Sequence, residues 1–195
     1  MEDWDERYER DSEEYDWYFS ANECCDAVES LAGLDDEILY VGCGTSGVGA
    51  ELYRRGRHFV TNIDTSKRAI QLMSQRSTEF ADMQFVEMDS TKLPKDLTSV
   101  FQLVLDKALL DYLLCDVRQD KAEKYLTEVR RVLKPGGAFC CVSHGIPEKR
   151  LALIAKAFTV PTSRIQVTPI AKPIVPGLEQ GASPNYFIYT VTQTR

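Results

Sequence analysis

The sequence contains few of the features that indicate a metal site, a disulfide framework or a membrane span. Only two histidines occur, and none of the six cysteines stands in a CxxC pair, the spacing typical of zinc and redox sites. No apolar run approaches the roughly 20 residues needed to cross a bilayer. Cys140 and Cys141 lie in an apolar run and are expected to be buried thiols. We therefore expect a reduced, metal-free protein with no membrane partner.

Positive charge is also scarce. The chain has 23 Lys and Arg against 30 Asp and Glu, for a net charge of −7, so we expect no nucleic-acid partner, because phosphate binding requires clustered basic residues. The first residues lack the basic start and apolar centre of a signal peptide, which predicts a cytoplasmic location. Acidic residues crowd residues 2–16. This segment is either a solvated acidic helix and tail or a negative field that attracts a basic protein.

Short apolar runs alternate with amphipathic stretches along most of the chain. The runs predict strands over residues 37–41, 59–63, 83–88, 100–105 and 138–143, and the stretches predict helices over 46–55, 66–80 and 118–133. Before them, a short helix or turn is expected over 4–10, and a capping box at Ser20 and Glu23 starts a helix that ends at Gly33. The alternation predicts a doubly wound, Rossmann-like α/β fold with a mostly parallel sheet and helices on both faces.

The pattern changes after a further helix near residues 147–157. Residues 164–170 and 186–192 alternate as two strands, and the segment between them is a loop rich in Pro and Gly. This predicts a C-terminal antiparallel hairpin that completes a seven-stranded sheet, where a dinucleotide-binding Rossmann domain would continue with another crossover helix. With 195 residues, 44% of them hydrophobic, the chain is expected to form one domain.

A glycine-rich loop follows the first predicted strand and opens a helix. Gly42, Cys43 and Gly44 stand at the turn, where glycines allow the backbone to approach a ligand closely and the helix N-terminus faces it. Taken alone, this motif fits NAD, S-adenosylmethionine (SAM) or an ordinary tight turn. Asp64, followed by Thr65, ends the second strand about twenty residues later. A carboxylate there can accept the hydroxyls of a ribose, or it can cap the next helix.

Acidic residues also end the third and fourth predicted strands. Asp89, followed by Ser90, is placed to accept from an adenine amino group in a SAM site, although a lone acid there is also a turn former. Asp106, Lys107 and Asp111 follow the fourth strand, at the carboxyl edge where ligands bind in such sheets. These three polar residues are either part of the site or members of an internal ion pair.

Three short segments and this order of motifs resemble a known family. Trp4-Asp5-Glu6-Arg7-Tyr8, Tyr15-Asp16-Trp17 and Leu105-Asp106-Lys107-Ala108-Leu109-Leu110-Asp111 resemble the class I SAM-dependent methyltransferases, and within them the methyltransferase-like group that contains the elongation factor 1-alpha (eEF1A) lysine methyltransferases. The resemblance runs from Trp4 to about Arg150. The group tends to have Gly-Thr where this chain has Ala108-Leu109, which leaves the acceptor open.

The resemblance implies SAM as cofactor, S-adenosylhomocysteine (SAH) as product, and a role for each matching position. Trp4, Tyr8 and Trp17 would close over the cofactor, unless these rings only staple the N-terminus to the sheet. The Gly42–Cys43–Gly44 loop would hold the methionine part, Asp64 with Thr65 the ribose, and Asp89 with Ser90 the adenine, and Lys107 would complete the site. Residues 1–35 would form a helical cap, 36–145 the cofactor-binding core and 146–195 a C-terminal helix and hairpin.

The predicted reaction is methyl transfer to the amine of a lysine on a protein substrate, with eEF1A suggested by resemblance alone. Asp106 and Asp111 are the nearest candidates for orienting that amine, unless Asp106 pairs with Lys107 instead. A small-molecule methyltransferase, a non-catalytic SAM-binding protein and an NAD-dependent oxidoreductase are the alternatives, because one fold serves many functions. The chain length suffices for a monomer, and no heptad pattern indicates a coiled coil.

Overall fold

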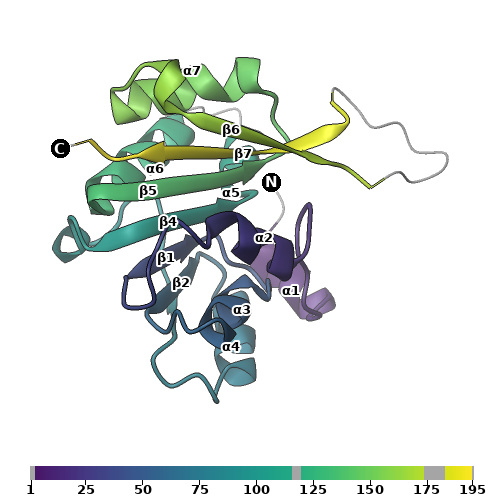
Figure 1. The fold of residues 1–195 in the computed structure, drawn as a ribbon. Helices are drawn as coiled ribbons and strands as arrows, with labels where there is room; N and C mark the ends of the chain where they lie inside the picture. The colour runs from purple at the N-terminus through teal and green to yellow at the C-terminus, as the bar shows by residue number, and fades with distance from the viewer. Residues whose placement is uncertain (1–2, 116–119, 174–182, 195) are drawn as a thin grey trace.

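A computed structural model describes residues 3–115, 120–173 and 183–194. The helices and strands form a layered α/β structure (Figure 1). The helices are α1 Trp4–Arg10, α2 Ala21–Val28, α3 Val48–Arg54, α4 Lys67–Arg76, α5 Leu109–Cys115, α6 Asp120–Val132 and α7 Pro147–Phe158. The strands are β1 Ile38–Val41, β2 Val60–Asp64, β3 Gln84–Glu87, β4 Phe101–Lys107, β5 Leu133–Ser143, β6 Gln166–Ala171 and β7 Asn185–Thr192.

The strands form one seven-stranded sheet in the order β3-β2-β1-β4-β5-β7-β6. The first five strands along the chain pair in parallel, whereas β7 runs antiparallel to both β5 and β6. This confirms the predicted doubly wound sheet with a C-terminal antiparallel hairpin. From β1 to β3 the chain moves toward one edge of the sheet, and from β4 to β5 it moves toward the other. The carboxyl ends of β1, β2 and β4 therefore border a crevice of the kind at which ligands bind.

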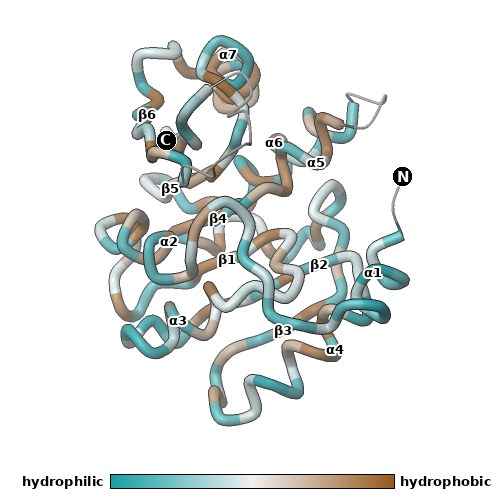
Figure 2. Tube along the Cα trace, turned by 90° about the vertical axis from the view of Figure 1, so that its right-hand side faces the viewer, coloured by the Kyte–Doolittle hydropathy of each residue, from teal (hydrophilic) through white to brown (hydrophobic). Residues whose placement is uncertain are grey.

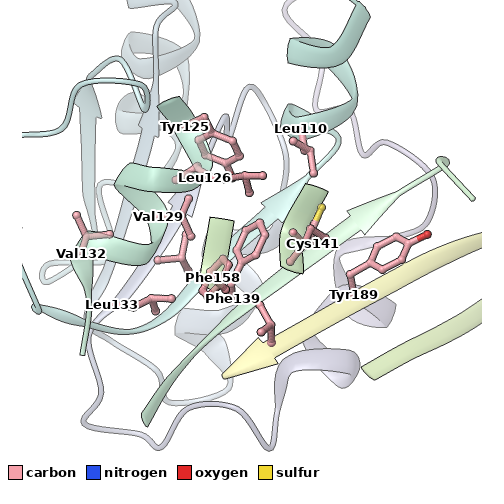
Figure 3. Close-up of a cluster of buried hydrophobic side chains, with 14 of the residues drawn as sticks. Leu110, Tyr125, Leu126, Val129, Val132, Leu133, Phe139, Cys141, Phe158 and Tyr189 are labelled. Atoms are coloured by element: carbon pink, nitrogen blue, oxygen red, sulfur yellow. The ribbon is translucent and has the colours of Figure 1, made fainter. Parts of the chain in front are cut away.

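Strand alternation divides the core into two layers. Leu39 and Val41 face the cluster under α5, α6 and α7, which Figure 3 shows around Phe139 and Phe158. On the other face, Tyr40 packs with the α2 and α3 side of the sheet. Such period-2 burial on both faces is what a parallel sheet covered on two sides requires.

The N-terminal elements begin as predicted. The side chain of Ser20 accepts a hydrogen bond from the Glu23 amide at 3.3 Å, and Glu23 Oε2 accepts from the Ser20 amide at 2.9 Å, so the capping box is present. Val28 ends this helix five residues before the predicted end at Gly33. In the described residues, no helix is long and apolar enough to cross a membrane.

Two features of the structure differ from the sequence prediction. The short helix α5 directly follows β4 without a loop that would mark it, and its pattern of apolar residues resembles a continued strand. Strand β5 begins at Leu133 and not at residue 138, because the Lys-Pro-Gly-Gly segment forms an irregularity inside the pairing with β4. Gly137 allows this, since a Cβ there would lie 2.9 Å from the Gln102 carbonyl oxygen. The predicted helix 118–133 is α6, and its first two residues lie outside the described part.

Candidate active site

The glycine-rich loop lies between the carboxyl end of β1 and the start of α3. Gly42 has φ +61° and Gly44 has φ +49°, a backbone region that residues with a Cβ rarely adopt. A Cβ at Gly42 would lie 3.0 Å from Cβ of Leu109, and one at Gly44 would overlap the Tyr8 hydroxyl. The loop is therefore a cradle that only glycine permits, held against α5 on one side and α1 on the other.

Asp64 lies at the end of β2, beside this cradle. Its Oδ2 accepts a hydrogen bond from the Gly44 amide at 2.8 Å, and its Oδ1 accepts from the Ser66 amide at 2.8 Å. Burial raises the pKa of Asp64 above its usual value, against the lowering effect of these amides. Ser66, and not Asp64, caps α4, because Ser66 Oγ accepts from the Ala69 amide at 3.0 Å. Each carboxylate oxygen of Asp64 keeps acceptor capacity toward the cavity that it lines.

A cavity of about 380 Å³ opens at these strand ends, within the range of about 300–1,000 Å³ common for small-molecule sites. Eight of the predicted cofactor-binding residues line it: Trp4, Tyr8, Trp17, Gly42, Asp64, Thr65, Ser90 and Lys107. A smaller pocket of about 30 Å³ shares four of these residues and is also lined by Cys43 and Gly44. The structure thus brings together residues that are far apart in the sequence.

Asp89 is the predicted cofactor residue that lines neither cavity. Its Oδ1 accepts hydrogen bonds from the Thr91 amide at 2.9 Å and the Thr91 hydroxyl at 2.7 Å. Oδ1 of Asp89 therefore closes its own turn, whereas Oδ2 lies 3.6 Å from Lys92 Nζ, and the role of Asp89 at the adenine stays a prediction. Its neighbours Met88 and Ser90 line the cavity instead.

Helix α1 covers the cavity from the N-terminal side. Asp5 Oδ1 accepts from the Ser66 hydroxyl at 2.6 Å and from the Arg68 amide at 3.0 Å, which ties α1 to the start of α4. Figure 2 shows α1, coloured mostly as hydrophilic, beside α4. The Trp4 ring nevertheless faces inward and meets Tyr112 of α5 edge-on, with ring centroids 5.2 Å apart. The cap is therefore polar outside and aromatic inside.

Lys107 is a buried cation whose partner is Asp16. The ammonium Nζ lies 2.7 Å from Asp16 Oδ1, and the Lys107 side chain has no exposed surface. The Phe19 ring lies 5.6 Å from the same ammonium, and Ser46 also donates to Asp16. The ion pair thus anchors the segment after α1 to the end of β4. The sequence had left open a pair between Lys107 and Asp106, which the structure does not form.

Asp106 is fully buried and does not line the cavity. Its carboxylate accepts from the Leu109 and Leu110 amides at 2.8 and 3.0 Å and from the Tyr125 hydroxyl at 2.8 Å. It therefore holds the start of α5 and connects this helix to α6. Burial raises the pKa of Asp106 to about 7, although the Tyr125 hydrogen bond lowers it.

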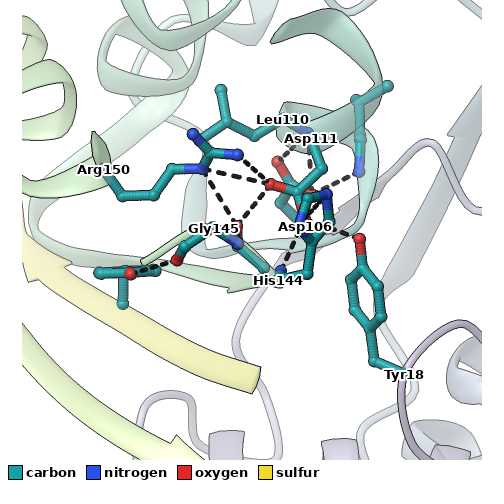
Figure 4. A network of polar contacts seen from close by, with 10 residues as sticks. Tyr18, Asp106, Leu110, Asp111, His144, Gly145 and Arg150 are labelled. Atoms are coloured by element: carbon teal, nitrogen blue, oxygen red, sulfur yellow. Dashed lines mark hydrogen bonds and ion pairs between the residues drawn. The ribbon is translucent and has the colours of Figure 1, made fainter. Parts of the chain in front are cut away.

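Asp111 does line the cavity, at the centre of a polar network (Figure 4). Oδ1 accepts from the Ser143 hydroxyl at 2.5 Å and from Arg150 Nη2 and Nε at 2.7 and 3.2 Å. Oδ2 accepts from the Tyr18 hydroxyl at 2.7 Å and the His144 amide at 2.8 Å. Arg150 and Ser143 hold the buried side of the carboxylate, and Tyr18 reaches it from the cavity side.

Several residues that line the cavity were missed by the sequence prediction: Tyr18, Met88, Ala108, Leu109, Tyr112, Cys115 and His144. Tyr112 and Cys115 belong to the helix that was not predicted, where positions i and i+3 share a face. His144 directly follows β5, so the rule that ligands bind at carboxyl strand ends could have identified it.

Comparisons with known proteins agree with this geometry. A family model described as "Methyltransferase domain" matches residues 38–137, and the chain belongs to this family. The structure is similar to that of the N-methyltransferase NodS from Bradyrhizobium japonicum WM9 in complex with SAH, with a TM-score of 0.66 at 15% identity over 100% of both chains. It is also similar to a Burkholderia thailandensis 1,6-didemethyltoxoflavin-N1-methyltransferase, with a TM-score of 0.67 at 17% identity over 97% of this chain and 84% of that chain.

Curated relatives are similar at higher identity. An "eEF1A lysine and N-terminal methyltransferase" of Xenopus laevis is 37% identical over 145 residues, which are 72% of this chain and 21% of that protein. An "EEF1A lysine methyltransferase 4" of Bos taurus is 31% identical over 166 residues, 79% of this chain and 64% of that protein. The chain thus spans about a fifth of the length of the first relative. The methyltransferase class predicted from the sequence is confirmed.

Proposed function

We propose that this chain transfers a methyl group from SAM to the side-chain amine of a protein lysine, with eEF1A as the substrate. The observation that carries the proposal is the cavity at the carboxyl ends of β1, β2 and β4. The glycine-rich loop, the Asp64 carboxylate and aromatic rings lie together there. The names of the relatives support the lysine and its carrier protein. Together they make methyl transfer the function that this geometry supports best.

The residues around the cavity fit SAM. Asp64 would accept the ribose hydroxyls, because both of its oxygens keep acceptor capacity, and Thr65 stands beside it. The backbone amides of the Gly42–Cys43–Gly44 loop would hold the methionine part. Asp89 with Ser90 would face the adenine, because only Oδ1 of Asp89 takes part in the turn with Thr91. Trp4 and Trp17 would cover the cofactor from α1 and the segment that follows it.

When bound, SAM supplies a methyl carbon that bonds to the acceptor nitrogen as its bond to sulfur breaks and the electron pair returns to sulfur, leaving SAH. The protein's part is to align the acceptor and exclude water, a contribution that can reach roughly 7–11 kcal/mol. The aromatic cap formed by Trp4, Tyr8 and Tyr112 suits the second task, because the Trp4 ring packs on Tyr8 of α1 and on Tyr112 of α5.

The chain is proposed to act as one methyltransferase unit over residues 1–195, as a monomer in the cytoplasm, on a protein partner and not on nucleic acid or a membrane. The acidic segment before residue 17 and the net charge of −7 support a basic protein partner, since opposite charge speeds encounter. A small-molecule acceptor is the competing proposal, because the same fold serves methyltransferases with different acceptors.

Calorimetry with SAM and transfer of labelled methyl to purified eEF1A test the proposal. We expect SAM to bind, and Asp64→Asn to weaken it by at least tenfold, since hydrogen bonds to a charged group contribute about 1.5–3 kcal/mol. Asp82→Asn, in an exposed turn, is the matched control and should bind SAM as the wild type does. Absence of SAM binding would refute the cofactor, and label found only on small molecules of a lysate would refute the protein substrate.

A further inference from the structure

The wall of the cavity contains a tyrosine in a strained backbone conformation. Tyr18 has φ +70°, which is uncommon for a bulky residue and occurs mainly where surrounding contacts impose it, often at functional sites. The contacts that hold Tyr18 are its hydrogen bond to Asp111 at 2.7 Å and its ring packing against Tyr186, with centroids 4.8 Å apart. The side chain is thus fixed at the wall of the cavity that it lines.

Asp111 itself has no acceptor capacity left for a substrate. Its two oxygens accept five hydrogen bonds, from the Tyr18 and Ser143 hydroxyls, the His144 amide and two nitrogens of Arg150. A carboxylate offers about four lone-pair sites, and the Arg150 guanidinium already compensates its charge at 2.7 Å. An amine that enters the cavity therefore meets a carboxylate that is fully occupied.

The groups around Asp111 that keep acceptor capacity are the Tyr18 oxygen and the His144 imidazole. Because the Tyr18 proton is donated to Asp111, the lone pairs of the phenol oxygen remain for another donor. Burial and the nearby Asp111 charge raise the pKa of Tyr18 far above its usual value, so the phenol keeps its proton and serves as an acceptor only. His144 Nε2 lies 3.9 Å from Asp111 Oδ2, its side chain is 52% exposed, and it lines the cavity.

We propose that the Tyr18 oxygen and the His144 imidazole form the acceptor-amine subsite, and that Asp111 is the positioning residue behind both. This inference rests on the proposed function. The Tyr18 oxygen accepts one N–H of the entering ammonium, and His144 takes a second proton onto an imidazole nitrogen. The electron pair of that N–H bond stays on the amine nitrogen, and the neutral amine turns about its C–N bond to direct this lone pair at the methyl donor. Deprotonation is necessary because a free lysine has a pKa of about 10.4, and imidazole is the side chain that most often performs it near neutral pH.

Three variants separate this role from a structural one. Tyr18→Phe removes the oxygen and keeps the ring, and His144→Asn removes the base. Tyr53→Phe, whose ring stacks on His58 and lines neither cavity, is the control for loss of a tyrosine hydroxyl. With eEF1A and saturating SAM, we expect kcat to fall at least tenfold in the first two variants, with the SAM dissociation constant within twofold of wild type. Tyr53→Phe should keep both values within twofold, and unchanged kcat in Tyr18→Phe and His144→Asn would overturn the proposal.

The two histidines allow a test that does not depend on eEF1A. In protein labelled with ¹³C-histidine and saturated with SAH, n-butylammonium serves as the mimic of a lysine side chain. We expect it to shift the His144 resonance and not that of His58, and Tyr18→Phe to reduce the shift at equal amine concentration. If the wild type binds SAM but does not methylate eEF1A, the protein-substrate proposal fails and this experiment still decides the subsite. A His144 resonance that does not respond to the amine overturns the subsite.

Discussion

Ala108 stands where the resembling family tends to have glycine, and its backbone gives a quantitative prediction. Its φ is +81°, a region that costs a residue with a Cβ about 1–2 kcal/mol. The conformation is imposed from both sides, because the Ala108 amide donates to the Val142 carbonyl at 3.1 Å and the Ala108 carbonyl accepts from the Tyr112 amide at 3.0 Å. The chain therefore cannot relax at this point without losing the start of α5.

Ala108→Gly should remove this strain. Glycine also gives the unfolded chain more conformational entropy, which offsets about 0.4–1 kcal/mol of this stabilisation. The net increase in the free energy of unfolding is therefore about 0.5–1 kcal/mol. For a chain of this length, 1 kcal/mol corresponds to about 2–4 °C in Tm, and we expect an increase of about 1–4 °C. Urea unfolding followed by circular dichroism, together with calorimetry, would measure both quantities.

Ala155→Gly is the matched control for this prediction. Ala155 is buried and lies inside α7, where glycine should lower the free energy of unfolding by about 1 kcal/mol. Opposite signs in the two variants would show that the effect at residue 108 comes from its backbone angle. An Ala108→Gly protein that is equally or less stable than the wild type would refute the reasoning.

Three further predictions follow from the ion pair, the N-terminal cap and the buried acid. Asp16→Ala should destabilise the fold by about 3 kcal/mol, because it leaves the Lys107 cation buried without its partner. Lys107→Met should destabilise it less, since the Asp16 carboxylate keeps contact with solvent. Urea unfolding checks this through the order of the midpoints of the two variants. Asp5→Ala should weaken SAM binding about fivefold through loss of the contacts to Ser66 and Arg68, with Glu9→Ala as the exposed control on the same helix, measured by calorimetry. The folded state holds the Asp106 proton up to a pKa of about 7, whereas the unfolded chain releases it near 3.9. Stability should therefore fall as pH rises from 5 to 7, by up to about 1.4 kcal/mol per pH unit, and Asp106→Asn should lack that slope in urea unfolding at a series of pH values; equal slopes in the two proteins would contradict the assignment.

The sequence by itself determined the sheet and the location of the candidate site. Apolar runs alternating with amphipathic helices predicted the parallel strands, and the absence of a last crossover helix predicted the C-terminal hairpin, because these patterns follow from local periodicity. Glycines at 42 and 44 and an acid at 64 could be identified for the same reason, since their spacing along a strand-turn-helix unit is local. All three lie at the cavity or at the small pocket beside it.

Only the tertiary structure decided which polar groups pair. Lys107 bonds to Asp16, 91 residues away, and not to its neighbour Asp106, because successive residues of β4 point to opposite faces of the sheet. The same long-range packing fills the acceptor capacity of Asp111 with Arg150, 39 residues away, and leaves Tyr18 and His144 to face the cavity. Pairing across such separations depends on how the strands and helices are placed around the sheet, which no local pattern of residues specifies.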